Sequence, residues 1–340
     1  MIKKWGLFLI CMIMAACIPG GPRPASAAPY QVNIGISGKG STYYPIGHAL
    51  AQIWETKLDG RVRASAQVAE STPRSIELMM HNEMQVVLGH STICYSAFHA
   101  TDAYKDKPGF PYKNLRGMLT LFPSAMQWVA RKNAGIRSIA DLKGKRIAPG
   151  HIASATEIHS RIILGAFGLN YIGSQGALTV AAEYRAYGEA ADLLKKGQID
   201  AAHIPAGIPT AAVTDLLSSD AGMLLSIDAD KIKAICDQYP WYFPLTIPAG
   251  TYPKQDRDVH TIALASLVFT DAKMPDELVY MLTKSIYDYH ADLVHAHRAA
   301  EYTVIANAFN GMTIPLHPGA IKYFEEKGVA VPDSLRPPAQ

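Results

Sequence analysis

Cysteine and charged residues are both scarce in this chain of 340 residues. Charged residues account for 18% and hydrophobic residues for 49% of the chain, so it can bury a large core, and its length suits two domains. Only four cysteines are present, and Cys11 and Cys17 both fall within the first 28 residues. Cys94 and Cys236 remain, and the sequence leaves open whether they pair or stay as free thiols.

The chain also lacks the common nucleotide and metal motifs. A phosphate-binding P-loop needs four residues between its first glycine and its Gly-Lys pair, but only two residues separate Gly35 from Gly38-Lys39. A dinucleotide-binding fingerprint needs a third glycine, and this chain has Tyr43 at that position. His295 and His297 point to different faces of a predicted helix, with no carboxylate pattern to complete a metal site. We therefore expect neither a metal nor a cofactor.

The first 28 residues have the layout of a cleaved secretory signal peptide. Two lysines precede an apolar run over residues 5–18, and small residues at 25–27 form a cleavage site, so we expect export to the periplasm. Cys17 offers an alternative, since residues 14–17 loosely resemble a lipoprotein signal whose cysteine is acylated. Methionine is an unusual first residue for that signal, and cleavage after Ala28 is preferred. No later stretch is long and apolar enough to span a bilayer.

Removing this leader leaves 340 − 28 = 312 residues and makes the chain electrically neutral. The leader contains Lys3, Lys4 and Arg23 and no acidic residue, so the formal charge changes from +3 to 3 − 3 = 0. A neutral surface does not favour binding to nucleic acid, which carries a dense negative charge. We therefore expect no nucleic-acid partner.

A glycine-rich turn over residues 38–47, GKGSTYYPIG, stands between a predicted strand and a predicted helix. Apolar residues alternate over 32–36, as in a strand, and recur at helical spacing from Ile46 to Trp54. The turn directs the first N–H groups of the helix toward the carboxyl end of the strand, where an anion is favoured. It carries four consecutive hydroxyl side chains, more than a helix cap needs. These candidate ligand-binding residues are Ser41, Thr42, Tyr43 and Tyr44.

Two more predicted strands end in polar residues. The strand over 62–68 leads into AESTPRS at 69–75, and the strand over 84–89 ends in a histidine and two hydroxyl residues. Arg74 either holds a carboxylate through its planar fork or is a solvated residue of the first helical turn. Polar residues that follow the carboxyl ends of successive strands predict an α/β sheet with a ligand-binding crevice at that edge. The candidates here are Ser71, Thr72, Arg74, Ser75, His90 and Ser91.

The tripeptide Gly89-His90-Ser91 raises the alternative of a serine hydrolase. The nucleophile elbow of that class needs a glycine two places after the serine, and this chain has Ile93 there. We therefore predict that the protein is not an enzyme. In this interpretation His90 hydrogen-bonds a ligand or is a satisfied polar residue.

The second half of the chain repeats the order of strand, turn and helix. A strand beginning at residue 145 leads into a helix over 158–167, and a strand over 199–204 precedes a helix over 208–217. Small and hydroxyl-bearing residues follow the carboxyl end of each of these two strands, as they do in the first half of the chain. The candidate ligand-binding residues are Ser154, Ala155, Thr156, Ala206 and Gly207.

Four further segments complete the prediction. Residues 260–270 form a long strand that returns to the first lobe, and residues 275–300 form one amphipathic helix. Residues 139–144 form a short helix ended by glycine. The aromatic turn at 239–243 either walls a ligand pocket or packs a loop, and the sequence does not decide between them.

Four short motifs, taken in order, resemble the TAXI family of extracytoplasmic solute receptors, which serve TRAP transporters. The resemblance extends over almost the whole chain after the leader, and its specificity comes from the combination of motifs. The motifs are STYYPIG at 41–47, DLKGKR at 141–146, GQIDA at 197–201 with Gly207 and Pro209, and IPLHPGA at 314–320.

The resemblance implies an α/β, two-lobed periplasmic-binding-protein fold, similar to type II, with the ligand in the interlobe cleft. We expect a first lobe over residues 29–125 and 264–340 and a second lobe over residues 126–263. The implied partners are a small organic anion, such as glutamate or 2-oxoglutarate, and the membrane subunits of a TRAP permease. We expect the receptor to be a monomer.

By position, the resemblance assigns ligand contacts to residues 42–44 of the first lobe and 154–156 of the second. Two departures from the family pattern put the family's best-known ligand in doubt. Arg74-Ser75 replaces a Gly-Ser pair, and residues 153–156 read Ala-Ser-Ala-Thr instead of Gly-Ser-Gly-Thr. The added methyl groups narrow the room for backbone approach, and Arg74 adds a cation. An alternative of another class is a ligand-sensing subunit that signals to a membrane kinase.

Overall fold

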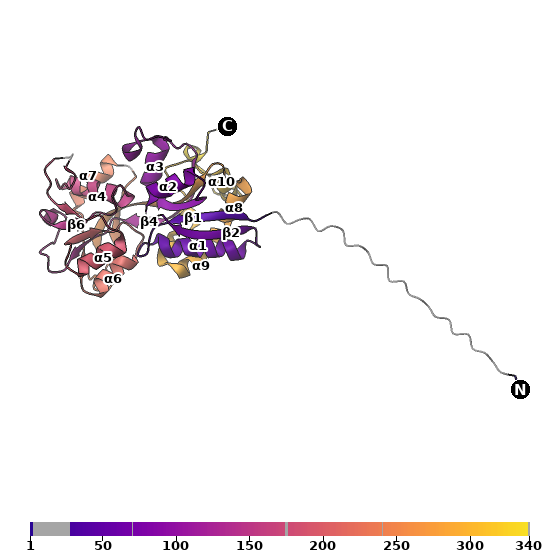
Figure 1. Ribbon diagram of the computed structural model, residues 1–340, viewed down its shortest axis with the longest axis horizontal. Coiled ribbons are helices and arrows are strands. Elements are labelled where there is room, and N and C mark those ends of the chain that lie inside the picture. The colour runs from indigo at the N-terminus through magenta and orange to yellow at the C-terminus, as the bar shows by residue number, and fades with distance from the viewer. Residues whose placement is uncertain (3–27, 70, 174–175, 240, 339–340) are drawn as a thin grey trace.

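The computed structural model shows two α/β lobes side by side (Figure 1). Most of the predicted signal peptide lies outside the described part of the chain, and so do Cys11 and Cys17. Within the described part, no helix has the length and apolar character needed to cross a membrane. The described residues are 1–2, 28–69, 71–173, 176–239 and 241–338.

The first lobe is built on a six-stranded mixed sheet. Its strands are β1 (Tyr30–Ile36), β2 (Val62–Val68), β3 (Val86–His90), β4 (Leu115–Ala125), β10 (Phe243–Ile247) and β11 (Val259–Asp271). The hydrogen-bonded order is β10-β11-β3-β1-β2, with β4 also paired to β11. β1 runs parallel to β2 and β3, whereas β11 is antiparallel to β3, β4 and β10. The parallel strands therefore have their carboxyl ends at one edge of the sheet.

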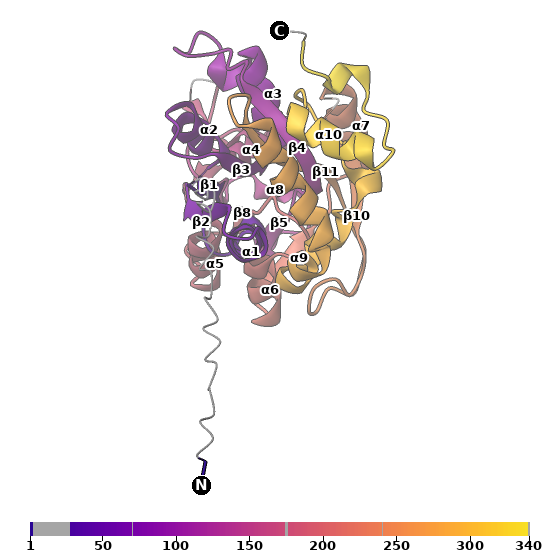
Figure 2. The same cartoon turned by 90° about the vertical axis from the view of Figure 1, so that its right-hand side faces the viewer.

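Helices cover both faces of this sheet (Figure 2). They are α1 (Tyr43–Lys57), α2 (Thr72–Met80), α3 (Ser91–His99), α8 (Asp276–Asp288), α9 (His290–Ala296) and α10 (Pro318–Glu326). On one face, α1, α8, α9 and α10 enclose a core that contains Trp54, Leu282 and Phe324. On the other face, α2 and α3 enclose a core that contains Ile76 and Phe269. The sheet is thus the central layer of the lobe.

The second lobe contains a five-stranded sheet in the order β7-β6-β8-β5-β9. Its strands are β5 (Trp128–Arg131), β6 (Arg146–Ala148), β7 (Ala181–Ala182), β8 (Ala201–His203) and β9 (Gly222–Leu225). β6 is parallel to β7 and β8, and β5 is antiparallel to β8 and β9. Its helices are α4 (Ala155–Ala166), α5 (Tyr187–Lys195), α6 (Ala211–Ser218) and α7 (Ala229–Gln238).

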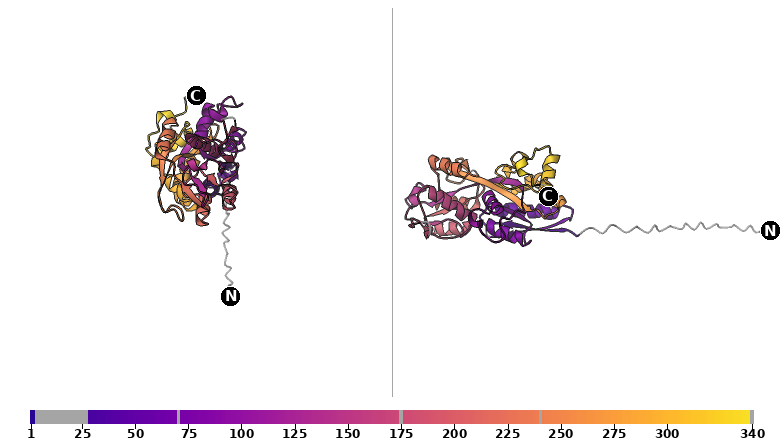
Figure 3. Two further views of the ribbon diagram at one scale, coloured as in Figure 1. Left: turned by 90° about the vertical axis from the view of Figure 1, so that its left-hand side faces the viewer. Right: turned by 90° about the horizontal axis from the view of Figure 1, so that it is seen from above.

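Two long strands join the lobes (Figure 3). β4 ends at Ala125, and after two residues the chain enters β5 of the second sheet. β11 pairs with β10 through residues 259–263 and with β4 through residues 263–271. Ile262 packs into a core of the second lobe, whereas Phe269 packs into a core of the first. The chain therefore crosses between the lobes along β4 and β11.

Several predicted elements agree with the structure, and others do not. The strands predicted over 62–68 and 260–270 correspond to β2 and β11. The single helix predicted over 275–300 is wrong, because Tyr289, at φ −110° and ψ 30°, separates α8 from α9. The helix predicted over 139–144 is only the 3-10 turn Ala140–Leu142.

The sequence pattern does not predict α3 or β10. α3 follows directly on His90, and no side chain forms a cap hydrogen bond at its start, so the usual helix-start signal is missing. β10 contains Pro244, which argues against a central strand. β10 lies at the edge of its sheet, where proline is tolerated. Phe243 of the aromatic turn is thus the first residue of a strand.

The two cysteines in the described part of the chain are free thiols. Cys94 is buried in the first lobe, and Cys236 is partly buried on α7 of the second lobe. The sequence left open whether these two cysteines pair. In the structure they lie in different lobes and are not bonded to each other.

Close packing of α8 on α10 requires a glycine at position 319. A Cβ atom there would clash with the backbone oxygen of Asp276 and lie 2.9 Å from the backbone nitrogen of Tyr280. We expect Gly319→Ala to lower the free energy of unfolding by about 1–3 kcal/mol, because helix backbone cannot move aside easily. Gly165→Ala, at an open position within α4, is the control and should raise it by about 1 kcal/mol or less. Urea denaturation measures both effects, and equal stabilities would contradict the packing argument.

Candidate ligand-binding site

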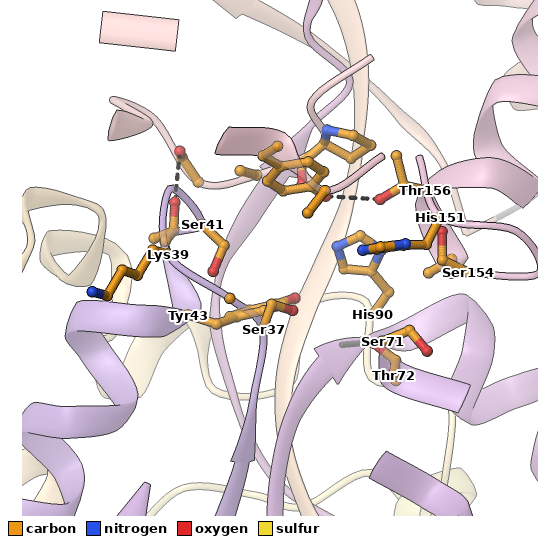
Figure 4. Close-up of a pocket in the computed structure, with 18 of the residues that line it drawn as sticks. Ser37, Lys39, Ser41, Tyr43, Ser71, Thr72, His90, His151, Ser154 and Thr156 are labelled. Atoms are coloured by element: carbon orange, nitrogen blue, oxygen red, sulfur yellow. Dashed lines mark hydrogen bonds between the residues drawn. The ribbon is translucent and has the colours of Figure 1, made fainter. Parts of the chain in front are cut away.

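A cavity of about 60 Å³ lies between the lobes, at the carboxyl ends of β1, β3 and β8 (Figure 4). We call it the cleft cavity. Loops that follow these strands and the first residues of several helices form its walls. The predicted residues that line it are Ser41, Thr42, Tyr43, Ser71, Thr72, His90, Ser154, Ala155, Thr156, Ala206 and Gly207.

Five helices, α1 to α5, begin at the cleft cavity. The first N–H groups of a helix have no partner within the helix, and they favour negative charge. Side chains cap two of these helices, since Ser71 accepts from the backbone N–H of Arg74 and Ser154 from that of Glu157. α1, α3 and α5 have no side-chain cap hydrogen bond. Within the described residues, no side chain therefore competes with a bound anion for these N–H groups, although the Tyr44 N–H donates to the Ser41 backbone oxygen at 3.3 Å.

Hydroxyl groups from both lobes line the cleft cavity. The hydroxyls of Thr156 and Tyr187 lie 2.8 Å apart in the second lobe, and the Tyr43 hydroxyl donates to Ser266 Oγ at 2.9 Å in the first. The Ser41 hydroxyl is buried, and it has no hydrogen-bond partner within the described part of the chain. Because an unpaired buried hydroxyl is costly, a polar atom in the cavity would find a ready partner in Ser41.

The two lobes touch directly beside the cavity. Thr42 Oγ1, at the start of α1, donates to the backbone oxygen of Gly207 in the second lobe at 3.0 Å. Gly40 has a φ of +92°, and the turn that it forms lies against Gly188 at the start of α5. These contacts describe a closed arrangement, in which both lobes bound the cavity.

A chain of hydrogen bonds runs from one lobe to the other through two histidines. His90, at the end of β3, contacts Ser124 Oγ at 3.1 Å and His159 Nε2 at 3.2 Å. His159, on α4, contacts the Tyr242 hydroxyl through Nδ1. Burial lowers the pKa of His90 to about 4, and burial together with His90 and His203 holds the pKa of His159 well below its ordinary value. Both imidazoles are therefore neutral at physiological pH.

The described residues that line the cleft cavity include two cations and no carboxylate. Arg185, just before α5, contacts the Glu183 carboxylate at 3.5 Å and has 44% of its side chain exposed. Lys39 is exposed, and its ammonium group points away from His90 (Figure 4). Across the described ranges, no cluster of three or more histidine, cysteine or acidic side chains is placed to hold a metal ion. The positive potential of the site comes from the helix starts and Arg185.

Tyr44 and Arg74 do not line the cavity, although the sequence makes both candidates. Arg74 lies on the exposed side of α2, where it pairs with Glu77 at 3.3 Å and has 55% of its side chain exposed. Tyr44 packs edge-on against His48, one turn further along α1, with ring centroids 4.6 Å apart. The helix periodicity directs each side chain to its own helix surface, away from the cavity.

Ser75 and Ser91 are buried, and they also do not line the cavity. The Ser75 hydroxyl donates to the backbone oxygen of Ser71 at 3.2 Å, because it sits one turn into α2. The Ser91 hydroxyl has no hydrogen-bond partner within the described residues. Its neighbour His90 is engaged with Ser124 and His159 instead. No base therefore contacts Ser91 in this arrangement.

Sequence reasoning missed a further set of lining residues. Residues 37–39 directly follow β1, and residues 185–186 directly precede α5, whose first residue is Tyr187. Phe122 lies within β4, and no sequence pattern marks it as part of a site. The missed residues are Ser37, Gly38, Lys39, Phe122, His151, Arg185, Ala186, Tyr187 and Pro205.

Two α/β lobes, a chain that crosses between them along β4 and β11, and a cavity bounded by both lobes define the fold of a periplasmic-type substrate-binding protein. Residues 34–328 match the family model of the NMT1-like family, and the chain belongs to that family.

Solved structures with a similar general fold include several binding proteins. The alkanesulfonate-binding protein SsuA from Xanthomonas axonopodis pv. citri, bound to MOPS, is 15% identical over 90% of this chain and 82% of its own, with a TM-score of 0.44. A TRAP periplasmic solute-binding protein from Shewanella oneidensis, with bound succinate, is 12% identical over 81% and 82%, with a TM-score of 0.46. The GluR0 ligand-binding core from Nostoc punctiforme, in complex with L-glutamate, is 13% identical over 81% and 98%, with a TM-score of 0.46. These likenesses concern the fold alone.

The buried histidines make the folded state sensitive to acid. The unfolded chain protonates a histidine near its ordinary pKa of 6.5, whereas folded His90 stays neutral down to about pH 4. Below pH 6.5 the unfolded state therefore binds more protons, and stability falls as the pH drops toward 4. We expect His159→Gln to reduce this slope by about 1.4 kcal/mol per pH unit, because one depressed histidine is removed.

Urea denaturation between pH 7.5 and pH 4.5 (roughly the range over which histidines titrate) measures this slope. His81→Gln is the control, since His81 is exposed at the end of α2 and should leave the slope unchanged. Equal slopes for the wild-type protein and His159→Gln would contradict a buried, neutral pair.

Proposed function

We propose that the protein is an extracytoplasmic solute receptor of a TRAP transporter, of the TAXI type, which binds a small organic anion in the cleft cavity. The ligand class is an amino acid or a dicarboxylate such as glutamate or 2-oxoglutarate, and the receptor delivers it to a membrane permease. The receptor acts as a monomer in the periplasm after export through its signal peptide. The four sequence motifs and the position of the cavity between the lobes support this proposal.

The convergence of five helix starts on one cavity carries the proposal. Three of these helices have uncapped N–H groups, and no carboxylate occurs among the described lining residues. Such a set of donors favours an anion through hydrogen bonds and through the helix dipoles. The Ser41 hydroxyl is buried and has no hydrogen-bond partner within the described residues, which is a second and independent indication that a ligand atom belongs beside it.

Closure of the lobes links binding to delivery. The helix starts come from both lobes, so a ligand satisfies all of them only when the lobes are together. The hydrogen bond from Thr42 to Gly207, at 3.0 Å, and the contact of His90 with His159, at 3.2 Å, support this closed arrangement. A ligand that binds the closed form more tightly than the open form increases the population of the closed form. The permease then recognises the closed form.

This function requires no catalytic group in the cavity. Ser91, the residue that a hydrolase would need as its nucleophile, lies outside the cavity lining, and its hydroxyl contacts no base. Both ring nitrogens of His90 are already in hydrogen-bonding contacts, Nε2 with Ser124 and Nδ1 with His159. We therefore propose a binding protein without turnover.

A substitution at Ser41 distinguishes an effect on ligand binding from an effect on stability. We expect Ser41→Ala to leave the ligand-free melting temperature unchanged or slightly higher, because it removes an unpaired buried hydroxyl. We expect the same variant to show a smaller rise in melting temperature with glutamate, 2-oxoglutarate or succinate, because the ligand loses a hydrogen bond. Thermal-shift measurements with and without each acid test both effects.

Ser91→Ala is the matched control for Ser41→Ala. It also removes an unpaired buried hydroxyl, but one outside the cavity lining, so the full ligand-induced rise should remain. The proposal fails if none of the three acids raises the melting temperature, or if Ser41→Ala keeps the whole effect.

Arg185 and Arg74 form a second matched pair. Arg185 lines the cleft cavity and Arg74 does not, although both arginines are about half exposed. We expect Arg185→Ala to weaken binding of the effective acid by about fivefold, as for a partly exposed charge pair of about 1 kcal/mol. Arg74→Ala should leave the affinity unchanged. Isothermal titration calorimetry compares the two variants, and an equal loss in both would place the charge preference outside the cavity.

A further inference from the structure

A second and larger cavity lies between the lobes, beyond the contact of His90 with His159. It has a volume of about 720 Å³ and shares no lining residue with the cleft cavity. Its walls come from α3 and the 3-10 turn Asp102–Tyr104 of the first lobe, and from α4, α7 and the aromatic turn of the second. We call it the aromatic cavity, and the proposed receptor function makes no use of it.

Three of the residues that line the aromatic cavity carry a buried donor with no hydrogen-bond partner within the described residues. These donors are the Tyr104 hydroxyl, Arg161 Nε and Trp241 Nε1. Tyr104 is the most deeply buried of the three residues, with 2% of its surface exposed. Buried polar groups in folded proteins are almost always hydrogen-bonded. Acceptor atoms on an occupant would be one way to supply the missing partners.

Aromatic rings form one wall of this cavity and reach across both lobes. Trp241 packs against Tyr239 and Tyr242 of its own turn, with ring centroids 5.6 Å and 6.4 Å away. It also packs against Tyr95, on α3 of the first lobe, at 5.5 Å. The ring planes of these pairs are tilted by 37° to 57°, and a flat aromatic ligand can pack against such rings. The wall thus favours an aromatic ring system.

The charged residues of the aromatic cavity favour a negative group on that ring system. Arg161 and Lys231 line it from the second lobe, against a single carboxylate, that of Asp102, from the first. The Asp102 carboxylate already accepts a hydrogen bond from the Ser96 hydroxyl at 2.7 Å. Lys231 has only a distant partner, its neighbour Asp230 at 3.8 Å. Arg161 already pairs with the Glu157 carboxylate at 2.8 Å, so Lys231 is the main charged partner that an anionic group would meet.

We infer that the aromatic cavity is a second ligand site, which takes a flat aromatic anion such as an aromatic carboxylate or sulfonate. The rings of the turn at 239–243 contact its ring system, and Lys231 and Arg161 contact its anionic group. Both lobes line the site, so its occupant holds the lobes in the closed arrangement. His159 and Tyr242 line this cavity while His159 contacts His90 of the cleft cavity, which joins the two sites.

Fluorescence titration with 8-anilinonaphthalene-1-sulfonate tests the inference, because this probe joins an aromatic ring system to a sulfonate. We expect saturable binding at one site per chain. N-phenyl-1-naphthylamine has the same rings without the sulfonate and should bind more weakly. We expect Lys231→Ala to weaken binding of the sulfonate by about fivefold, as for a partly exposed charge contact. Trp241→Ala should weaken both probes, because it removes the central ring of the wall.

Lys233→Ala is the control for Lys231→Ala, since Lys233 lies on the same helix with 77% of its side chain exposed and pairs with Asp237. It should leave sulfonate binding unchanged. Ser41→Ala should also leave it unchanged, which separates this site from the cleft cavity. Absence of saturable sulfonate binding would overturn the inference, as would equal affinities of Lys231→Ala and Lys233→Ala.

Discussion

Helix starts leave backbone N–H groups without partners inside the helix, and in this protein five such starts face one cavity. Each buried N–H group must find an acceptor, or the fold loses stability. Ser71 and Ser154 supply acceptors at two starts, and the other three have no side-chain cap. The need of these groups for an acceptor is the physical basis of the anion site that we propose between the lobes.

The arrangement of lobes follows from that need and from the two strands that cross between them. β4 and β11 are paired along residues 263–271, so the crossing is a stiff antiparallel ribbon and not a loose linker. Two of the interlobe contacts are polar but uncharged, the bonds of Thr42 to Gly207 and of His90 to His159, and the contact of Tyr95 with Trp241 is aromatic. Neutral contacts of this kind form and break with a small cost in free energy, which suits the proposed opening and closing of the lobes.

Particular residues show how far the sequence could predict the site. Residues 154–156 stand at a helix start that is visible from a strand, a small-residue turn and a helical pattern, and they do line the cavity. Arg74 stands at a similar start and lies outside, because its position in the first turn of α2 directs it to solvent. Phe122 and His159 had no local signal, since β4 and α4 bring them to the interface only in the folded chain.

The sequence by itself determined the units of this protein: strands that end in polar turns, each followed by a helix start. These depend on the local alternation of apolar residues and on turn chemistry, which neighbouring residues decide. Only the tertiary structure decided which starts share a cavity, which arginine lines it, and that a second, aromatic cavity lies beyond the histidine pair. Those features depend on contacts between residues far apart in the chain, such as Thr42 with Gly207, and no local pattern encodes them.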